Sequence, residues 1–305
     1  MDENKHVKEN YDLSISFKTV ANKILNFLHE RLGFQLWAIT RVQGDHWIML
    51  VNKDSGYDIE GRNVFVWSDS FCSRMVQSLG PKIAPRVKDI PAYTDAPINK
   101  ELPISAYIGI PLKSEDGRLF GTLCAIDPAE KLESLKDELP LLNLFGEIIS
   151  KIIQADMKTQ KLIIDLELTK LNMDKDPVTD LYNNEAWDKL LTKEQERCDA
   201  FGSPALILII KADNTNKNAE LLKDISGYIK NSFRLSDIKA YLGHNTFAIL
   251  AIEIDNDLTN EFISRIRNKL NSKKMPVKIG WAQHDPRNTL IETQAQAEKK
   301  ISPLQ

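Results

Sequence analysis

Three cysteines are the most reactive side chains in this 305-residue sequence, and their spacing limits the chemistry that they could carry. Cys72, Cys124 and Cys198 are odd in number, lie far apart and form no Cys-x-x-Cys pair. This argues against a disulfide framework and against a zinc site, and it favours a reducing compartment. Cys72 and Cys124 could serve a redox role, although the sequence shows no neighbour that would lower the pKa of either thiol.

The composition is that of two ordinary globular domains. Hydrophobic residues make up 42% of the 305 residues and charged residues 27%, which is enough apolar material for two cores. The formal net charge of -3 argues against nucleic-acid binding by the chain as a whole. The polar N-terminus has no signal-peptide core, and no apolar run is long enough to span a bilayer, so we expect a cytoplasmic protein.

The first half of the sequence predicts a sheet flanked by helices. An amphipathic pattern over 14–32 predicts a helix that Gly33 ends. Further on, 70–79 reads as a short helix, and the proline-rich stretch 81–103 reads as an ordered loop. Strand-like runs separated by turn residues occupy 35–41, 46–52, 63–67, 106–112 and 119–126.

The longest helical pattern covers 139–171. Its apolar stripe has mixed spacing rather than a strict heptad, and it is formed by Leu142, Phe145, Ile149, Ile152, Leu162, Leu166 and Thr169, with Ile148, Ile153, Ile163 and Leu168 beside it. Such a helix either packs only on its own domain or forms a parallel coiled coil that joins two copies of the chain. We favour the second interpretation and expect a homodimer.

The second half alternates helices and strands, which is typical of an α/β sandwich. Asp176-Pro177 ends the long helix. Helical patterns follow at 185–197, 220–233, 257–270 and from 288, and strand patterns at 205–210, 238–242, 247–252 and 277–282.

Two motifs in the first half resemble the GAF family. The run Tyr107–Leu112 followed by Asp116–Asp127 is similar to the closing strands of that domain, and Trp67–Cys72 is similar to the start of the helix that covers its ligand pocket. The resemblance implies an antiparallel sheet flanked by helices, a GAF-type sensor over 1–155, and an unknown small ligand between the sheet and its covering helices. Candidate pocket residues are Trp37, Trp67, Phe71, Cys72, Tyr93, Tyr107 and Cys124, each of which is also a natural core residue.

The second half resembles the GGDEF family, the diguanylate cyclases, after a connecting helix over 139–175. Asp176–Trp187 is similar to the family's opening motif Asp-x-Leu-Thr-Gly-Leu-x-Asn-Arg, with Asp180 in place of Gly and Asn184 in place of Arg. At the signature Gly-Gly-Asp-Glu-Phe this chain has Gly243, His244, Asn245, Thr246 and Phe247. The resemblance implies a central sheet with surrounding helices over 176–305.

The departures from the family pattern remove the groups that cyclase chemistry needs. The family joins two GTP molecules with the help of Mg²⁺, which is held by an acid at the end of the first strand and by an acid of the signature. Lys211 and Thr246 stand at these positions, and only Asp213 of the Asp-x-Asp pair remains. We therefore expect a degenerate GGDEF domain that is no enzyme and holds no metal or cofactor.

One element of the family's regulation is retained. In active diguanylate cyclases an Arg-x-x-Asp set five residues before the signature forms a product-binding inhibitory site, and Arg234 and Asp237 have this spacing from Gly243. Arg265 matches the second arginine of that site. Arginine can clamp a phosphate or a guanine edge, and a carboxylate can accept from guanine N–H groups. The alternative is a solvated pair that caps a helix end.

These features lead to three hypotheses. The first is a non-catalytic regulator in which the GAF half senses a ligand and the degenerate half binds cyclic di-GMP. The second is a module that binds only a protein partner, which the sequence does not identify. The third is residual GTP binding. Titration with cyclic di-GMP separates the first two.

Overall fold

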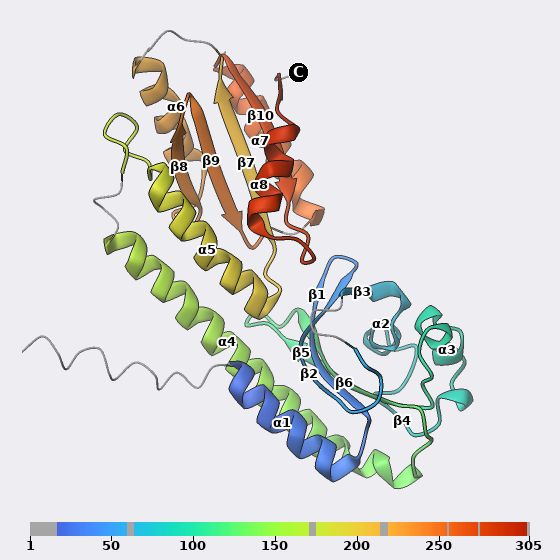
Figure 1. Ribbon diagram of the computed structural model, residues 1–305. Coiled ribbons are helices and arrows are strands. Elements are labelled where there is room, and N and C mark those ends of the chain that lie inside the picture. The colour runs from blue at the N-terminus through green and yellow to red at the C-terminus, as the bar shows by residue number, and fades with distance from the viewer. Residues whose placement is uncertain are drawn as a thin grey trace, which may run out of the picture. The chain divides into compact units, whose positions relative to one another are not determined.

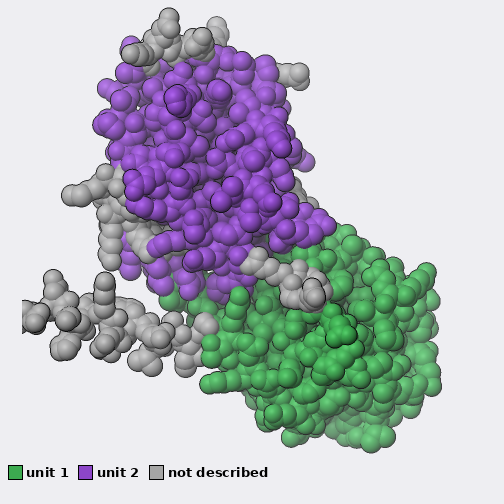
Figure 2. All heavy atoms as spheres, viewed as in Figure 1, with its two compact units in different colours: residues 1–159 green, residues 160–305 purple. Residues whose placement is uncertain are grey.

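The computed structural model describes residues 17–59, 64–170, 175–213, 219–254, 256–273 and 275–303. The chain divides into two compact units, residues 1–159 and 160–305 (Figure 2). Within the described residues, no helix is long and apolar enough to cross a bilayer.

The first unit is built on a six-stranded antiparallel sheet with the order β3-β2-β1-β6-β5-β4 (Figure 1). The predicted strands are confirmed with small shifts at their ends, and one short strand is added: β1 (Leu36–Gln43), β2 (His46–Asp54), β3 (Val64–Val66), β4 (Ile83–Ala84), β5 (Ala106–Lys113) and β6 (Leu119–Asp127). Gly44 and Gly117, at φ of 56° and 81°, make the tight β1–β2 and β5–β6 turns.

Short helices cover one face of this sheet. They are η1 (Trp67–Asp69), α2 (Phe71–Val76), η2 (Val87–Asp89), α3 (Pro91–Thr94) and η3 (Pro97–Lys100), so the proline-rich stretch is an ordered chain of turns. The Ser70 side chain caps α2 by accepting from the Ser73 N–H group. The predicted 70–79 helix ends early because Ser78 adopts a φ of 61°.

Two long helices, α1 (Phe17–Leu32) and α4 (Leu139–Lys170), belong to the opposite face, and η4 (Glu133–Glu138) leads into α4. Leu142, Ile149 and Ile153 are buried on α4, and a Cβ at Gly146 would lie 2.6 Å from the Ile110 side chain, so the first half of α4 packs closely on β5. Other apolar side chains of α4 are exposed: Leu144, Ile148, Leu162, Ile163 and Leu166. The side chains of Leu168 and Thr169 lie outside the described residues.

The second unit has a five-stranded antiparallel sheet with the order β11-β10-β7-β9-β8 (Figure 1). Its elements follow the predicted alternation: α5 (Asn184–Phe201), β7 (Ala205–Ala212), α6 (Ala219–Ser232), β8 (Ile238–Gly243), β9 (Thr246–Ile252), α7 (Asn256–Ser272), β10 (Val277–Gln283), α8 (Leu290–Lys299) and β11 (Ser302–Pro303).

Alternation along β7 divides the second unit into two cores. Leu206, Leu208 and Ile210 pack with side chains of α6 and α7, whereas Ile207 and Ile209 pack with side chains of α5 and α8. The sheet is therefore covered on both faces, which explains why β7 is apolar without interruption up to its last two residues.

Side-chain hydrogen bonds and ion pairs hold the segment that begins the second unit. The Asp176 carboxylate accepts from the backbone N–H of Thr179 at 2.8 Å, and Asp180, which stands at the family's glycine, adopts a φ of 52°. Asp180 forms ion pairs with Lys230 (2.7 Å) and Lys175 (3.3 Å), and the Lys230 contact holds the pKa of Asp180 below its ordinary value. Asn183 then caps α5.

Candidate functional site

The signature hairpin is a two-residue turn between β8 and β9. His244 and Asn245 have φ of 49° and 60°, and two successive positive φ values define the type I′ turn that suits the twist of a hairpin. The Asn245 N–H donates to the Tyr241 hydroxyl (3.3 Å), and its carbonyl accepts from the Ala212 N–H (2.9 Å). The turn is thereby attached to the end of β7, where the family's metal-binding acid would stand.

The strand register brings the two metal positions of the family together. Lys211 on β7 is exposed and lies directly opposite Thr246 on β9 and opposite Lys278 on β10. The remaining acid, Asp213, lies 2.9 Å from the Lys278 ammonium group. Mg²⁺ prefers carboxylate oxygens, and here two lysines and a hydroxyl surround one carboxylate that is already paired. These residues do not fit a magnesium ion.

A cleft at the end of the β8–β9 hairpin away from the turn brings Arg234, Asp237 and Arg265 together. Arg234 and Asp237 belong to the turn between α6 and β8, and Arg265 to α7. The cleft has a volume of about 410 Å³. The three residues line it with Tyr228, Asn231, Ser232, Phe233, Ile254, Phe262, Ile266 and Lys269.

Asp237 is buried at this cleft, so the interpretation of a solvated pair is wrong for the aspartate. Its side chain is 3% exposed, and Oδ2 accepts from the Arg234 N–H at 2.8 Å, as a capping residue would. Oδ1 makes no hydrogen bond within the described residues. Burial raises the pKa of Asp237 against the opposing effect of the Arg234 and Ile252 N–H groups and of the Lys239 and Arg234 charges.

Both arginines are exposed to the cleft's solvent. The Arg265 guanidinium lies 5.4 Å from the centre of the Phe262 ring, and the Arg234 carbonyl accepts from the Lys239 ammonium group at 2.6 Å. The arrangement places two exposed planar cations and one buried carboxylate at a single cleft. Lys269 adds a further cation that we did not predict, although its position four residues after Arg265 places both on one face of a helix.

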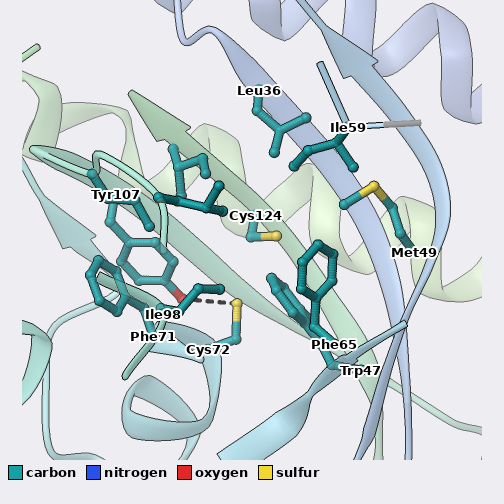
Figure 3. A pocket seen from close by; sticks show the side chains of 13 residues that line it. Leu36, Trp47, Met49, Ile59, Phe65, Phe71, Cys72, Ile98, Tyr107 and Cys124 are labelled. Carbon is teal, nitrogen blue, oxygen red and sulfur yellow. Dashed lines mark hydrogen bonds between the residues drawn. The ribbon is translucent and has the colours of Figure 1, made fainter. Parts of the chain in front are cut away.

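A second cavity lies in the first unit between the sheet and α2 (Figure 3). Phe71, Cys72, Tyr107 and Cys124 line it, as predicted. It is otherwise formed by residues that we did not predict: Leu36, Trp47, Met49, Ile59, Phe65, Ile98, Leu102, Ile104 and Ile126. Its volume is about 20 Å³, which is room for about one water molecule.

Three predicted pocket residues lie outside this cavity. Trp37 follows Leu36 on β1 and therefore points to the opposite face of the sheet, where it meets the Phe34 ring at 5.7 Å. Tyr93 stacks on the ring of Phe71, which lines the cavity, with a centroid distance of 4.8 Å. Trp67 packs against the surrounding core.

The chain matches two family models. Residues 16–153 match the GAF domain, and residues 173–289 match the family described as diguanylate cyclase, GGDEF domain. No curated protein matches the chain.

Several solved structures are similar at low identity. The GGDEF domain of DgcB from Caulobacter crescentus, in complex with c-di-GMP, is 15% identical with a TM-score of 0.38, and the match covers 41% of this chain and 86% of that one. A DGC protein from Thermotoga maritima is 22% identical with a TM-score of 0.37, covering 42% and 100%. The type II free methionine-R-sulfoxide reductase from Thermoplasma acidophilum is 14% identical with a TM-score of 0.36, covering 46% and 93%.

Proposed function

Because the chain is a GAF domain followed by a GGDEF domain, and thus a protein of cyclic di-GMP pathways, we propose that it binds cyclic di-GMP without making it. The GAF half is the sensory domain, and the GGDEF half is the receptor. The observation that carries this proposal is the single cleft formed by Arg234, Asp237 and Arg265.

The loss of synthesis follows from the charges at the signature hairpin. Lys211 and Lys278 lie side by side where the family binds a divalent cation, and Asp213 is engaged with Lys278. The positive charges of the two lysines repel a divalent cation at this position. Incubation with GTP and Mg²⁺ or Mn²⁺ should yield no cyclic di-GMP above a heat-denatured control, and clear turnover would contradict the proposal.

The chemistry of the cleft suits a cyclic dinucleotide. Each guanidinium can donate two parallel hydrogen bonds to a phosphate or to the O6/N7 edge of guanine. Asp237 also lines the cleft, and carboxylate oxygens can accept from the guanine N1–H and N2–H groups. Asp237 Oδ1 is buried without a hydrogen bond within the described residues, so a guanine that reached it would supply the missing donors.

Calorimetric titration of the full chain tests the receptor. We expect micromolar or tighter binding of cyclic di-GMP, weakened on the order of tenfold or more by Arg234→Ala and by Arg265→Ala, since each removes charge-assisted hydrogen bonds. Asp237→Asn should weaken it as well, because an amide cannot accept from two guanine donors in the same way. Arg287→Ala is the matched control, since Arg287 is an exposed arginine outside the cleft that pairs with Asp285.

The competing hypothesis is an interaction module without a nucleotide. If the unmodified chain shows no heat of binding at high micromolar cyclic di-GMP, the receptor is refuted and the protein-binding role takes its place. Binding of GTP with comparable affinity would instead favour residual substrate binding.

The long helix α4 is the proposed link between copies of the chain. Leu162 and Leu166 are 57% and 61% exposed, one helical turn apart, beyond the part of α4 that packs on the GAF sheet. Apolar side chains at this spacing are covered when two such helices associate in parallel. The GAF ligand would then act on the receptor through the relative positions of two helices.

A further inference from the structure

In a buried hydrogen-bond network of the GAF unit, two N–H groups that can only donate determine how the hydroxyl groups are oriented. The Trp47 indole N–H and the Thr122 backbone N–H both donate to Thr40 Oγ1, at 2.9 and 3.1 Å. With both acceptor positions filled, the Thr40 hydroxyl must donate its own proton, either to Thr122 Oγ1 at 2.8 Å or to the Thr122 carbonyl at 3.1 Å. In both cases the Thr122 hydroxyl keeps its own proton for another acceptor. The Thr122 hydroxyl then donates to the Cys72 sulfur at 3.3 Å.

A second hydroxyl group donates to the same sulfur atom. The Tyr107 hydroxyl donates to Cys72 Sγ at 3.3 Å, and the Cys124 side chain lines the same cavity. Burial, followed by the charge on Cys72, raises the pKa of Tyr107, so the phenol keeps the proton that it donates. A sulfur atom that accepts hydrogen bonds from two hydroxyl groups is stabilised as the thiolate.

The three cysteines therefore differ in their chemistry. Burial opposes ionisation of Cys72, but the bonds from Cys124, Thr122 and Tyr107 outweigh it and hold the pKa of Cys72 below its ordinary value. The hydrogen bond to Cys72, together with burial, raises the pKa of Cys124, which remains a thiol. Burial raises the pKa of Cys198, which lies in the other unit and serves as an internal reference.

The space beside the two sulfur atoms limits what can react there. Both point into the apolar cavity, with the Tyr107 hydroxyl directed at Cys72 (Figure 3). A volume of about 20 Å³ is room for about one water molecule, so only an oxidant of similar size can reach the two sulfur atoms. The cavity depends on Gly109, because a Cβ there would lie 1.8 Å from the Tyr107 hydroxyl oxygen.

We propose that Cys72 and Cys124 form a redox centre that is oxidised by hydrogen peroxide. The Cys72 thiolate attacks one peroxide oxygen, so an S–O bond forms as the O–O bond breaks, and the leaving hydroxide takes up a proton to become water. The Cys124 sulfur then attacks the sulfur of the Cys72 sulfenic acid. The S–S bond forms as the S–O bond breaks, and the departing hydroxide takes the proton of the Cys124 thiol and leaves as a second water.

In sum, two thiols lose two electrons and peroxide is reduced to two water molecules. This inference goes beyond the proposed cyclic di-GMP function and does not depend on the cleft of the GGDEF unit. Hydrogen peroxide would then be the signal that the GAF unit senses, and no ligand larger than the cavity would be needed.

The direct test is oxidation of the reduced full-length chain with stoichiometric hydrogen peroxide. Intact mass should fall by two hydrogen atoms, and a non-reducing digest should contain the Cys72 and Cys124 peptides joined. Cys198→Ala should behave as the unmodified chain, whereas Cys72→Ala should abolish the reaction. In Cys124→Ala the intact mass should rise by one oxygen atom, and a digest should place that oxygen on Cys72 as the sulfenic acid. The proposal is overturned if Cys72 reacts no faster than Cys198, or if Cys72 and Cys124 stay reduced in excess peroxide.

The residues that donate to Cys72 are positioning residues. Variants that remove only their hydroxyl groups test the reactivity of Cys72 without changing the packing. Tyr107→Phe and Thr122→Val keep the shape of each side chain but should each slow oxidation about tenfold near neutral pH. The titratable groups that face Cys72 are Tyr107, Cys124 and Tyr93. At pH of about 10, where an ordinary thiol is ionised, both variants should regain most of the unmodified rate. Unchanged rates at neutral pH would refute the role of the donors.

Discussion

Arg197 on α5 is the residue whose removal should most damage the GGDEF unit. It is 7% exposed, and its Nε donates to Glu194 Oε1 at 2.8 Å while its Nη1 lies 2.8 Å from Glu253 Oε1. Glu194 is 1% exposed, and its second carboxylate oxygen has no hydrogen bond within the described residues. Arg197 is therefore the main group that stabilises a buried negative charge.

Arg197→Met keeps most of the side-chain volume and removes the charge. Breaking a buried pair from one side costs about 3–5 kcal/mol, because the remaining ion is left uncompensated. Glu253 contributes less to this loss, since its side chain is 39% exposed and can be solvated. For a unit of this size the loss lowers the melting temperature by roughly 10 °C or more.

The pH dependence gives the sign of the effect. Burial raises the pKa of Glu194 even with Arg197 present, and removing the arginine raises it further. The folded state then favours the protonated acid, so the defect is full above that raised pKa. The loss of stability becomes smaller as the pH falls through the raised pKa of Glu194 towards the ordinary glutamate value of about 4.3.

Scanning calorimetry of Arg197→Met at pH 7.5 and 5 measures the loss of stability of the GGDEF unit at each pH. The unfolding transition of the GAF unit is the internal control. The double variant Glu194→Leu with Arg197→Met should be closer to the unmodified chain than the single variant, because it buries no charge. A loss below about 1 kcal/mol in the single variant, or a loss in the double variant that equals the sum of its parts, would refute the reasoning.

Two further predictions concern the hairpin and the long helix. His244→Asn with Asn245→Gly should stabilise the GGDEF unit by about 1 kcal/mol, since it places the preferred pair in a type I′ turn, and a lower melting temperature would show that the turn is of another type. Leu162→Glu with Leu166→Glu should halve the mass measured by light scattering, because it puts charges in the proposed dimer contact, and an unchanged mass would exclude this part of α4 as the interface.

The elements of the fold were largely predictable because both sheets have simple apolar patterns. The end of α5 shows the limit. The pattern predicted a helix up to Arg197, but the helix continues to Phe201, and Gly202 ends it with a φ of 62°. Glu194 and Arg197 have the spacing of a solvated charged face, and a sequence pattern does not separate such a face from a buried ion pair.

The candidate sites were predictable where the motif itself carries the geometry. Arg234 and Asp237 are three residues apart, and they share a cleft with Arg265 as predicted. The two threonines of the Cys72 network were missed because their positions depend on the register between strands. Thr40 and Thr122 pair directly across β1 and β6, which no local pattern reveals. Trp37 was assigned to the pocket on residue type alone, although strict alternation places Leu36 and Trp37 on opposite faces.

The left-handed backbone at Asp180 and His244 has a consequence for substitution at these two positions. Both stand where the GGDEF family has glycine, yet their φ values of 52° and 49° are those that glycine adopts freely. A residue other than glycine holds this conformation at about 1 kcal/mol of backbone strain for each position. Glycine at either position would require no movement of the main chain, so the backbone of this unit can accept the family's residue without rearrangement.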